Sequence, residues 1–168
     1  RKIIADKIEE YNITIPEINK IKEGAHLERN SKLISNDELT KDPLPPRSYA
    51  FMTDTLFSRQ HMELISNVDI VYHEATFLHQ DKALARTTMH TTARQAGVFA
   101  REANLKHLLI GHFSTRYKTD TLFEEECRKE FSHSTAARDG DLISWSDNHN
   151  AGFKLSRDNS EYDLPQNS

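Results

Sequence analysis

The segment over residues 107–117 limits the fold more than any other stretch of this chain. Leu108, Leu109, Ile110 and Gly111 are apolar or small, and they lead directly into His112, which is followed by Phe113 and a Ser-Thr turn. This pattern predicts a short buried strand. The carboxyl end of that strand would place His112 in a polar cleft.

Two earlier segments have the same design. Residues 49–53 form an apolar run that ends before Asp54, and residues 68–72 form another that ends before His73 and Glu74. Three short strands that each end in Asp, His or Glu predict one shared site at the strand ends of an α/β sheet. Folds of this class usually bind their ligands at that edge.

Length and composition restrict the function further. The 168 residues suit one domain, and no apolar run approaches the roughly 20 residues of a membrane span, so we expect a cytoplasmic protein without membrane contact. A net charge of −4 argues against a broad basic face for nucleic acid, so any such contact must be local. Nine histidines raise the question of a metal site. We expect Cys127 to be a core residue without a catalytic role, because it lies at helical spacing between Phe123 and Phe131.

Periodicity predicts the remaining elements. Thr92 and Gln95 fit a capping box that opens a helix, whose stripe of small residues would lie flat on the sheet. The other expected elements are helices over 2–11, 58–65 and 121–131, a turn or short helix over 15–24, irregular structure or short edge strands over 25–47, a loop over 75–89, and a strand pair over 134–138 and 142–145. We expect one domain over residues 1–146 and a polar, loosely held tail over 147–168.

Four residues at these predicted strand and helix ends carry chemistry. Asp54 and His112 are residue types that bind zinc, and together they would supply half of a dinuclear site, although Asp54 could instead cap the next helix. His90 is a candidate general acid or phosphate contact, and Glu74 is a candidate to orient it. Taken singly, His90 and Glu74 could also be solvated loop residues. Arg116 could grip a phosphate or pack under a turn.

The other histidines receive structural or surface assignments. We expect His73 to be structural, because it points to the opposite side of its strand from Glu74. The histidines in polar surroundings are expected at the surface: His26, His61, His79, His107, His133 and His149.

In combination, four motifs resemble the C-terminal half of ribonuclease Z. They are Asp54-Thr55, the run His73-Glu74-Ala75-Thr76, the run His90-Thr91-Thr92, and residues 111–117, Gly-His-Phe-Ser-Thr-Arg-Tyr, in this order. The resemblance covers roughly residues 1–146. It implies a metallo-β-lactamase fold, of which this chain would be the C-terminal half of an αββα sandwich, and an enzyme that trims the 3′ end of precursor tRNA.

The resemblance also implies roles for single residues. Asp54 resembles the aspartate that bridges two zinc ions, His112 the last histidine ligand, and His90 the histidine that assists the departing oxygen with Glu74 as its partner. Residues 16–24, with Lys22, are loosely similar to a loop that holds the RNA 3′ end. Two further residues of the last motif, Ser114 and Arg116, would contact the substrate.

The chain departs from the family pattern in what it lacks. The first metal motif, His-x-His-x-Asp-His, a further histidine ligand and the arm that grips tRNA do not occur in it. The chain also has no initiating Met, so we expect a piece of a longer protein. The resemblance implies that the intact protein is a homodimer and binds two Zn²⁺ ions. By itself this piece should bind zinc weakly or not at all and should not catalyse. Two alternatives are another hydrolase of the same fold and a non-catalytic interaction module.

Overall fold

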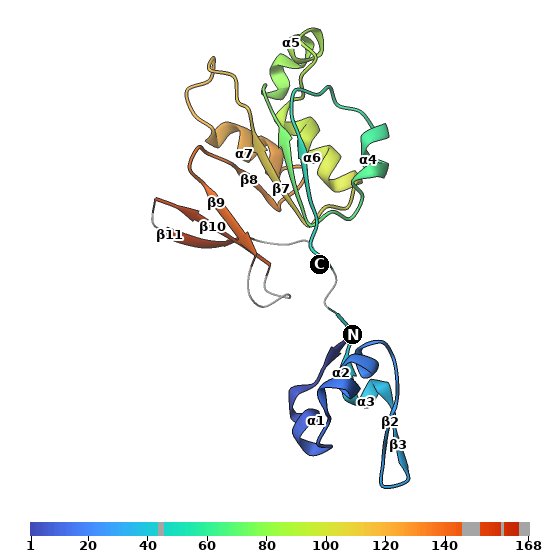
Figure 1. Ribbon diagram of the computed structural model, residues 1–168. Coiled ribbons are helices and arrows are strands. Elements are labelled where there is room, and N and C mark those ends of the chain that lie inside the picture. The colour runs from blue at the N-terminus through green and yellow to red at the C-terminus, as the bar shows by residue number, and fades with distance from the viewer. Residues whose placement is uncertain (44–45, 146–151, 159, 165–168) are drawn as a thin grey trace. The chain divides into compact units, whose positions relative to one another are not determined.

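The computed structural model describes residues 1–43, 46–145, 152–158 and 160–164. The chain forms two compact units, Arg1–Pro46 and Arg47–Ser168 (Figure 1). Within the described residues, no helix is both long and apolar enough to cross a lipid bilayer.

The described residues of the first unit, 1–43 and 46, form three short helices and two small antiparallel ladders. The helices are α1 (Ala5–Glu10), α2 (Ile15–Lys22) and α3 (Asn36–Leu39). Strand β1 (Lys2–Ile3) pairs with β4 (Thr40–Lys41), and β2 (Leu27–Arg29) pairs with β3 (Lys32–Ile34). Five apolar residues form its core: Ile13, Ile21, Leu27, Ile34 and Leu39. The helix expected over residues 2–11 is shorter than predicted, because its first residues are taken up by β1.

Helix α2 begins where its sequence predicts. Glu17 accepts hydrogen bonds from the backbone N–H and the hydroxyl of Thr14 at 2.9 and 2.8 Å, and Pro16 lies in the first turn, where no N–H donor is needed. Arg29 of β2 pairs with the same carboxylate at 2.8 Å. Glu17 therefore ties the start of α2 to the β2–β3 ladder.

The second unit is built on a parallel sheet of four strands in the order β5-β6-β7-β8 (Figure 1). These strands are β5 (Tyr49–Met52), β6 (Ile70–Glu74), β7 (His107–Gly111) and β8 (Ser134–Ala136). The helices of this unit are α4 (Gln60–Leu64), α5 (Lys82–Thr87), α6 (Ala93–Glu102) and α7 (Thr121–Arg128), with a 3₁₀ turn over His79–Asp81. The predicted α/β class is confirmed.

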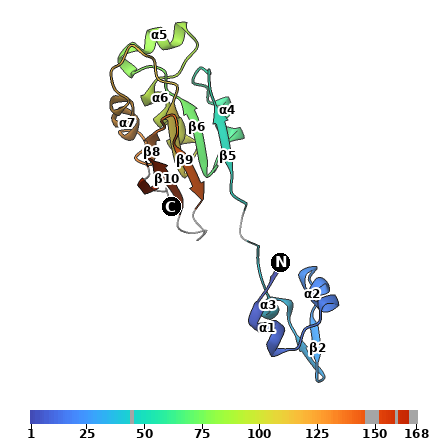
Figure 2. The ribbon, with the colours of Figure 1, turned by 60° about the vertical axis from the view of Figure 1, so that its left-hand side comes forward.

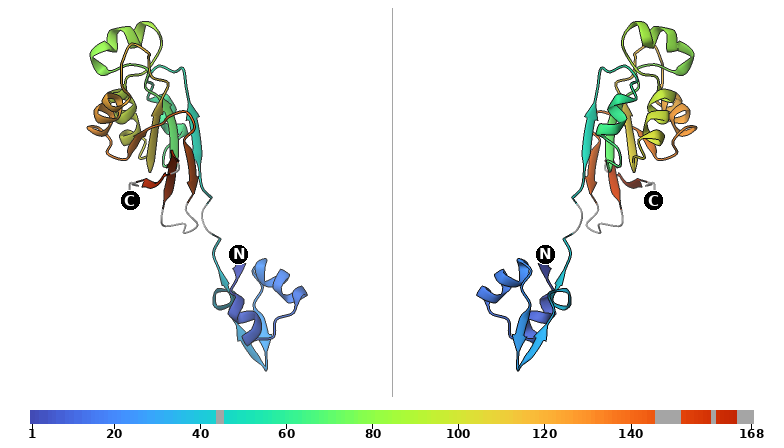
Figure 3. Two further views of the ribbon diagram at one scale, coloured as in Figure 1. Left: turned by 90° about the vertical axis from the view of Figure 1, so that its left-hand side faces the viewer. Right: turned by 90° about the vertical axis from the view of Figure 1, so that its right-hand side faces the viewer.

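Helices α6 and α7 cover one face of this sheet (Figure 2). Val71, Leu108 and Ile110 point to this side and pack with buried residues of the two helices, among them Phe99 and Phe123. The capping box at the start of α6 is confirmed, because Thr92 Oγ1 accepts from Gln95 N at 3.2 Å and Gln95 Oε1 accepts from Thr92 N at 3.1 Å. Figure 3 shows the helices gathered on one side of the strands.

A second, antiparallel sheet packs against the opposite face. It consists of β9 (Leu142–Trp145), β10 (Phe153–Arg157) and β11 (Ser160–Leu164) in the order β11-β10-β9. Ile70 and Leu109 alternate with the residues that face the helices, and they contact Phe153, Leu155 and Leu164 of this second sheet. The main sheet is therefore covered on both faces at these positions.

The C-terminal region differs from the sequence prediction in two ways. Residues 134–138 and 142–145 do not form a hairpin: β8 pairs in parallel with β7, whereas β9 pairs with β10. Residues 153–157 and 160–164 are strands and not a loosely held tail, because their alternate apolar residues are buried on the main sheet. Asp147 and His149 lie outside the described residues. The expected loop over 75–89 contains the 3₁₀ turn and α5.

Candidate active site

Parallel pairing brings three predicted site residues to one edge of the main sheet. Met52 pairs with His73 and Glu74 pairs with Gly111, so Asp54, Glu74 and His112 all lie at or just beyond the carboxyl ends of adjacent strands. Asp54 and His112 both have left-handed backbone conformations, with φ of 49° and 60°. Such values are uncommon for residues other than glycine, and they mark the abrupt turns that follow β5 and β7.

His90 reaches the same edge from the segment before α6. Phe77 and Thr92 form an isolated parallel bridge, and Ala93 N donates to Phe77 O at 2.9 Å. This pairing holds the start of α6 against the segment that follows β6. His90 is therefore placed beside the strand ends although it is 16 residues from Glu74 in the sequence.

Asp54, His90 and His112 form a candidate metal cluster. Each offers one ligand atom, and the three atoms lie within 4.8 Å of one another. Asp54 Oδ1 is 3.6 Å from His112 Nε2, and their side chains are 63 % and 42 % exposed. The ring centres of His90 and His112 are 5.4 Å apart.

The donor set fits a zinc-type ion in chemistry but not in number. Two imidazole nitrogens and one carboxylate oxygen are common zinc ligands, and a zinc ion takes about four ligands. Three donors would nearly complete one ion and fall well short of two. The described residues therefore supply only part of a metal centre.

The carboxylate of Glu74 lies beneath this cluster and is fully buried. It accepts hydrogen bonds from four donors: Thr55 N at 2.6 Å, Thr76 Oγ1 at 2.5 Å, His90 Nδ1 at 2.9 Å and Thr91 N at 3.2 Å. Because a buried carboxylate needs several donors to replace water, this set accounts for its burial. Glu74 thus holds the His90 ring, as the sequence predicted, and also binds the backbone after β5.

Sequence reasoning did not identify Thr76 as a site residue. Its hydroxyl lies 2.8 Å from His112 Nδ1 and 2.5 Å from Glu74 Oε2, and the residue is 7 % exposed. A threonine two positions after a strand-end glutamate was the available signal. The contact with His112 spans 36 residues and could not be derived from spacing.

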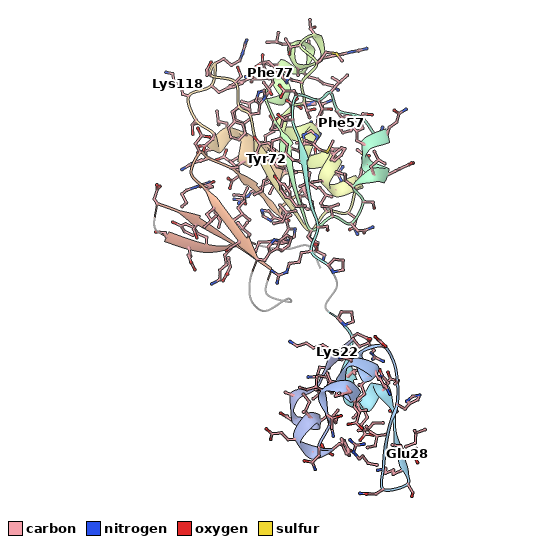
Figure 4. The ribbon with its side chains drawn as sticks, in the orientation of Figure 1. Lys22, Glu28, Phe57, Tyr72, Phe77 and Lys118 are labelled. Atoms are coloured by element: carbon pink, nitrogen blue, oxygen red, sulfur yellow. The ribbon has the colours of Figure 1, made fainter. Side chains whose placement is uncertain are left out.

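Two of the three predicted substrate contacts, Arg116 and Ser114, belong to the same unit as the cluster. The Arg116 guanidinium lies 5.5 Å from the centre of the Phe77 ring, and the Phe77 ring, labelled in Figure 4, is 6.1 Å from the ring of His90. Arg116 therefore contacts a residue that neighbours His90. Ser114 N donates to Thr76 O at 3.0 Å. Lys22 belongs to the other unit, at the end of α2 (Figure 4).

Three further titratable groups, His73, His107 and Cys127, are buried in the core. His73 is buried, and desolvation lowers its pKa, while its Nδ1–H donates to Glu74 O at 2.7 Å. Burial raises the pKa of the Cys127 thiol to about 12, which fits the core role predicted for it. His107 was predicted at the surface and is fully buried, because Phe153 of β10 covers its ring and Thr135 Oγ1 lies 3.1 Å from its Nε2.

Comparison with known proteins places this site in context. No protein-family profile matches the sequence. Among solved structures, the metallo-beta-lactamase fold protein YhfI from Bacillus subtilis is similar, with a TM-score of 0.46 and 21 % sequence identity over 49 % of this chain and 34 % of that chain.

Similarity in sequence is more extensive. Ribonuclease Z of Bacteroides fragilis is 38 % identical over 143 residues, which are 84 % of this chain and 47 % of that protein. Ribonuclease Z of Phocaeicola vulgatus is 42 % identical over 135 residues, 80 % of this chain and 44 % of that protein. The Porphyromonas gingivalis enzyme is 42 % identical over 130 residues, 77 % and 43 % respectively. The resemblance indicated by the motifs is confirmed: the chain is a relative of ribonuclease Z, and it spans about half the length of the curated relatives it matches.

Proposed function

We propose that this chain supplies one half of a zinc-dependent endoribonuclease site that removes the 3′ trailer of precursor tRNA. The convergence of Asp54, His90 and His112 within 4.8 Å, in a chain related to ribonuclease Z, is the observation that supports the proposal. The second unit would be the C-terminal half of a metallo-β-lactamase sandwich. The curated relatives are about twice as long as the matched region, so another part of the whole protein would supply the remaining ligands.

Asp54 and His112 would hold the metal in this proposal. Bound zinc would supply positive charge that acidifies a water molecule and balances charge on the scissile phosphate. Asp54 and His112 are exposed, so their ligand atoms are accessible to ions and to the missing ligands. This fragment alone would bind zinc weakly, because it offers too few donors.

His90 would transfer a proton rather than bind metal. Its Nδ1–H donates to Glu74, which orients the ring and leaves Nε2 for the cluster side. In the protonated form, His90 could give a proton to the departing 3′ oxygen, and the buried Glu74 carboxylate would stabilise the imidazolium. The products would be tRNA with a 3′ hydroxyl and a trailer with a 5′ phosphate.

The substrate would be held outside the cluster. Arg116 carries a charge suited to a backbone phosphate, and it lies above Phe77 close to His90. Ser114 follows in the same turn, and Lys22 would contact the RNA 3′ end in the whole protein. We further propose a cytoplasmic homodimer, as the family resemblance implies.

The first test is the mass and zinc content of the protein in its source. A chain about twice this length that carries about two zinc ions and cleaves precursor tRNA would support the proposal. A natural chain of 168 residues without metal would contradict it and leave the interaction module. Zinc binding with no tRNA cleavage would indicate another hydrolase of the same fold.

Three substitutions in the whole protein separate the proposed roles. Asp54→Ala and His112→Ala should lose both bound zinc and cleavage, whereas His90→Ala should keep zinc and lose cleavage. His133→Ala is the control, because His133 contacts Phe131 away from the cluster. Loss of zinc in His90→Ala would show instead that His90 is a ligand, which the 4.8 Å cluster permits.

A further inference from the structure

The hydroxyl of Thr76 lies between the buried Glu74 carboxylate and the His112 ring. It contacts Glu74 Oε2 at 2.5 Å and His112 Nδ1 at 2.8 Å, with His90 Nδ1 more distant at 3.4 Å. Glu74 is fully buried and Thr76 nearly so, so water has little opportunity to replace either contact. The hydroxyl therefore connects a buried carboxylate to the imidazole of a proposed metal ligand.

The number of protons in this chain of contacts determines their direction. A hydroxyl has one proton to donate, and a carboxylate has only lone pairs to offer. The short contact with Glu74 therefore uses the Thr76 proton, and the Thr76 oxygen must accept from His112. The Thr76 oxygen can accept this hydrogen bond only if His112 Nδ1 carries a proton.

We propose that Thr76 is a positioning residue that fixes His112 as the tautomer with its proton on Nδ1. The Nε2 atom then carries a free lone pair, and it is the atom that lies 3.6 Å from Asp54 Oδ1. Glu74 also accepts from His90 Nδ1. One carboxylate therefore determines which ring nitrogen carries the proton in both histidines, in His90 directly and in His112 through Thr76. The use of Nε2 as a ligand atom rests on the proposed function, whereas the tautomer itself does not.

Backbone contacts keep these groups aligned. Ala75 N donates to Gly111 O at 2.8 Å, and Ser114 N donates to Thr76 O at 3.0 Å. The segment that carries Thr76 is therefore paired with the backbone on both sides of His112. These two bonds fix the backbone positions from which the Thr76 hydroxyl and the His112 ring project.

The experiment is ¹⁵N NMR of the histidine rings in the metal-free chain of 168 residues, at about pH 8.5, where neutral imidazole dominates for an ordinary histidine. The two ring nitrogens have well separated shifts according to which carries the proton. We expect Nδ1 of His112 to be protonated in the unmodified chain. In Thr76→Val the proton should move to Nε2, so the two signals exchange positions.

Two variants control this result. Thr76→Ser retains a hydroxyl and should restore the original tautomer. Thr135→Val removes another buried threonine that contacts a histidine, His107, and should leave the His112 signals unchanged. A protonated Nε2 in the unmodified chain, or unchanged His112 signals in a folded Thr76→Val variant, would overturn the inference. The measurement on the unmodified chain decides the matter even if Thr76→Val does not fold.

Failure of this inference can be distinguished from failure of the proposed function. In the whole protein, we expect Thr76→Val to weaken zinc binding by about 10- to 100-fold, as loss of a partner to a ligand histidine commonly does. If the tautomer is as inferred and the whole protein binds no zinc, the function fails and the inference stands. If zinc binds and the tautomer differs, the reverse holds.

Discussion

Replacement of Gly97 by alanine tests how tightly α6 packs on α7. A methyl group at Gly97 would lie 2.6 Å from the carbonyl oxygen of Cys127 and 3.0 Å from Glu130 Cβ. Both distances are shorter than ordinary carbon contacts, and the nearer atom belongs to the backbone, so no rotamer change can relieve it. The two helices would have to move apart.

Helix α7 is poorly able to move. Phe123 and Cys127 are fully buried under it, and its Glu124 carboxylate accepts from Ala136 N of β8 at 2.8 Å. Alanine in place of glycine favours a helix interior by about 1 kcal/mol. Overpacking a tight interface costs about 1 to 3 kcal/mol. We expect a net loss of about 1 kcal/mol in the free energy of unfolding.

Urea unfolding followed by fluorescence measures this change in the second unit, because Trp145 is the chain's one tryptophan. For a loss of about 1 kcal/mol, the midpoint should fall by roughly 0.5 M. Ala83→Gly, at an exposed position of α5, is the control that measures helix propensity without a close contact. A midpoint that rises in Gly97→Ala would refute the argument, because propensity would then outweigh packing.

Two predictions concern buried titratable groups. Cys127 should resist thiol-specific reagents in the native chain and react on unfolding, because burial raises its pKa to about 12; rapid native labelling would contradict its core position. Burial lowers the pKa of His73, so below the unfolded pKa of about 6.5 the unfolded chain binds more protons than the folded one. The contribution of His73 is therefore complete above that pH and lost as the pH falls below it. The midpoint of urea unfolding, followed by Trp145 fluorescence, should decline from pH 7 to pH 5.5, and His73→Gln should make this decline smaller. Part of the decline should remain in the variant, because burial also lowers the pKa of His79.

Three strands of the main sheet, β5, β6 and β7, and the edge that carries the candidate site could be predicted because the signals are local. Each strand is a short apolar run, and the residue type that follows it, Asp54, Glu74 or His112, indicates the edge to which the strand points. The signal for the start of α6 is equally local, since the side chains of Thr92 and Gln95 each accept a hydrogen bond from the other residue's backbone N–H. These features depend on few residues that are close in the sequence.

The features that the sequence did not predict depend on distant partners. Phe153, Leu155 and Leu164 lie in a polar region, and their burial is explained only by Ile70 and Leu109 on the main sheet. His107 was assigned to the surface for the same reason, because β10 was not expected to cover it. Such contacts are absent from any window of sequence around the residue.

The four donors to Glu74 have a consequence for assembly. They come from the segments after β5 and β6 and from the segment before α6, so one carboxylate ties together three connections of the chain. Ordering a residue costs about 1 to 2 kcal/mol in backbone entropy. In this chain that cost is met during folding, before any ligand binds. Binding partners would thus encounter a preorganised surface, and more of their interaction energy would remain available as affinity.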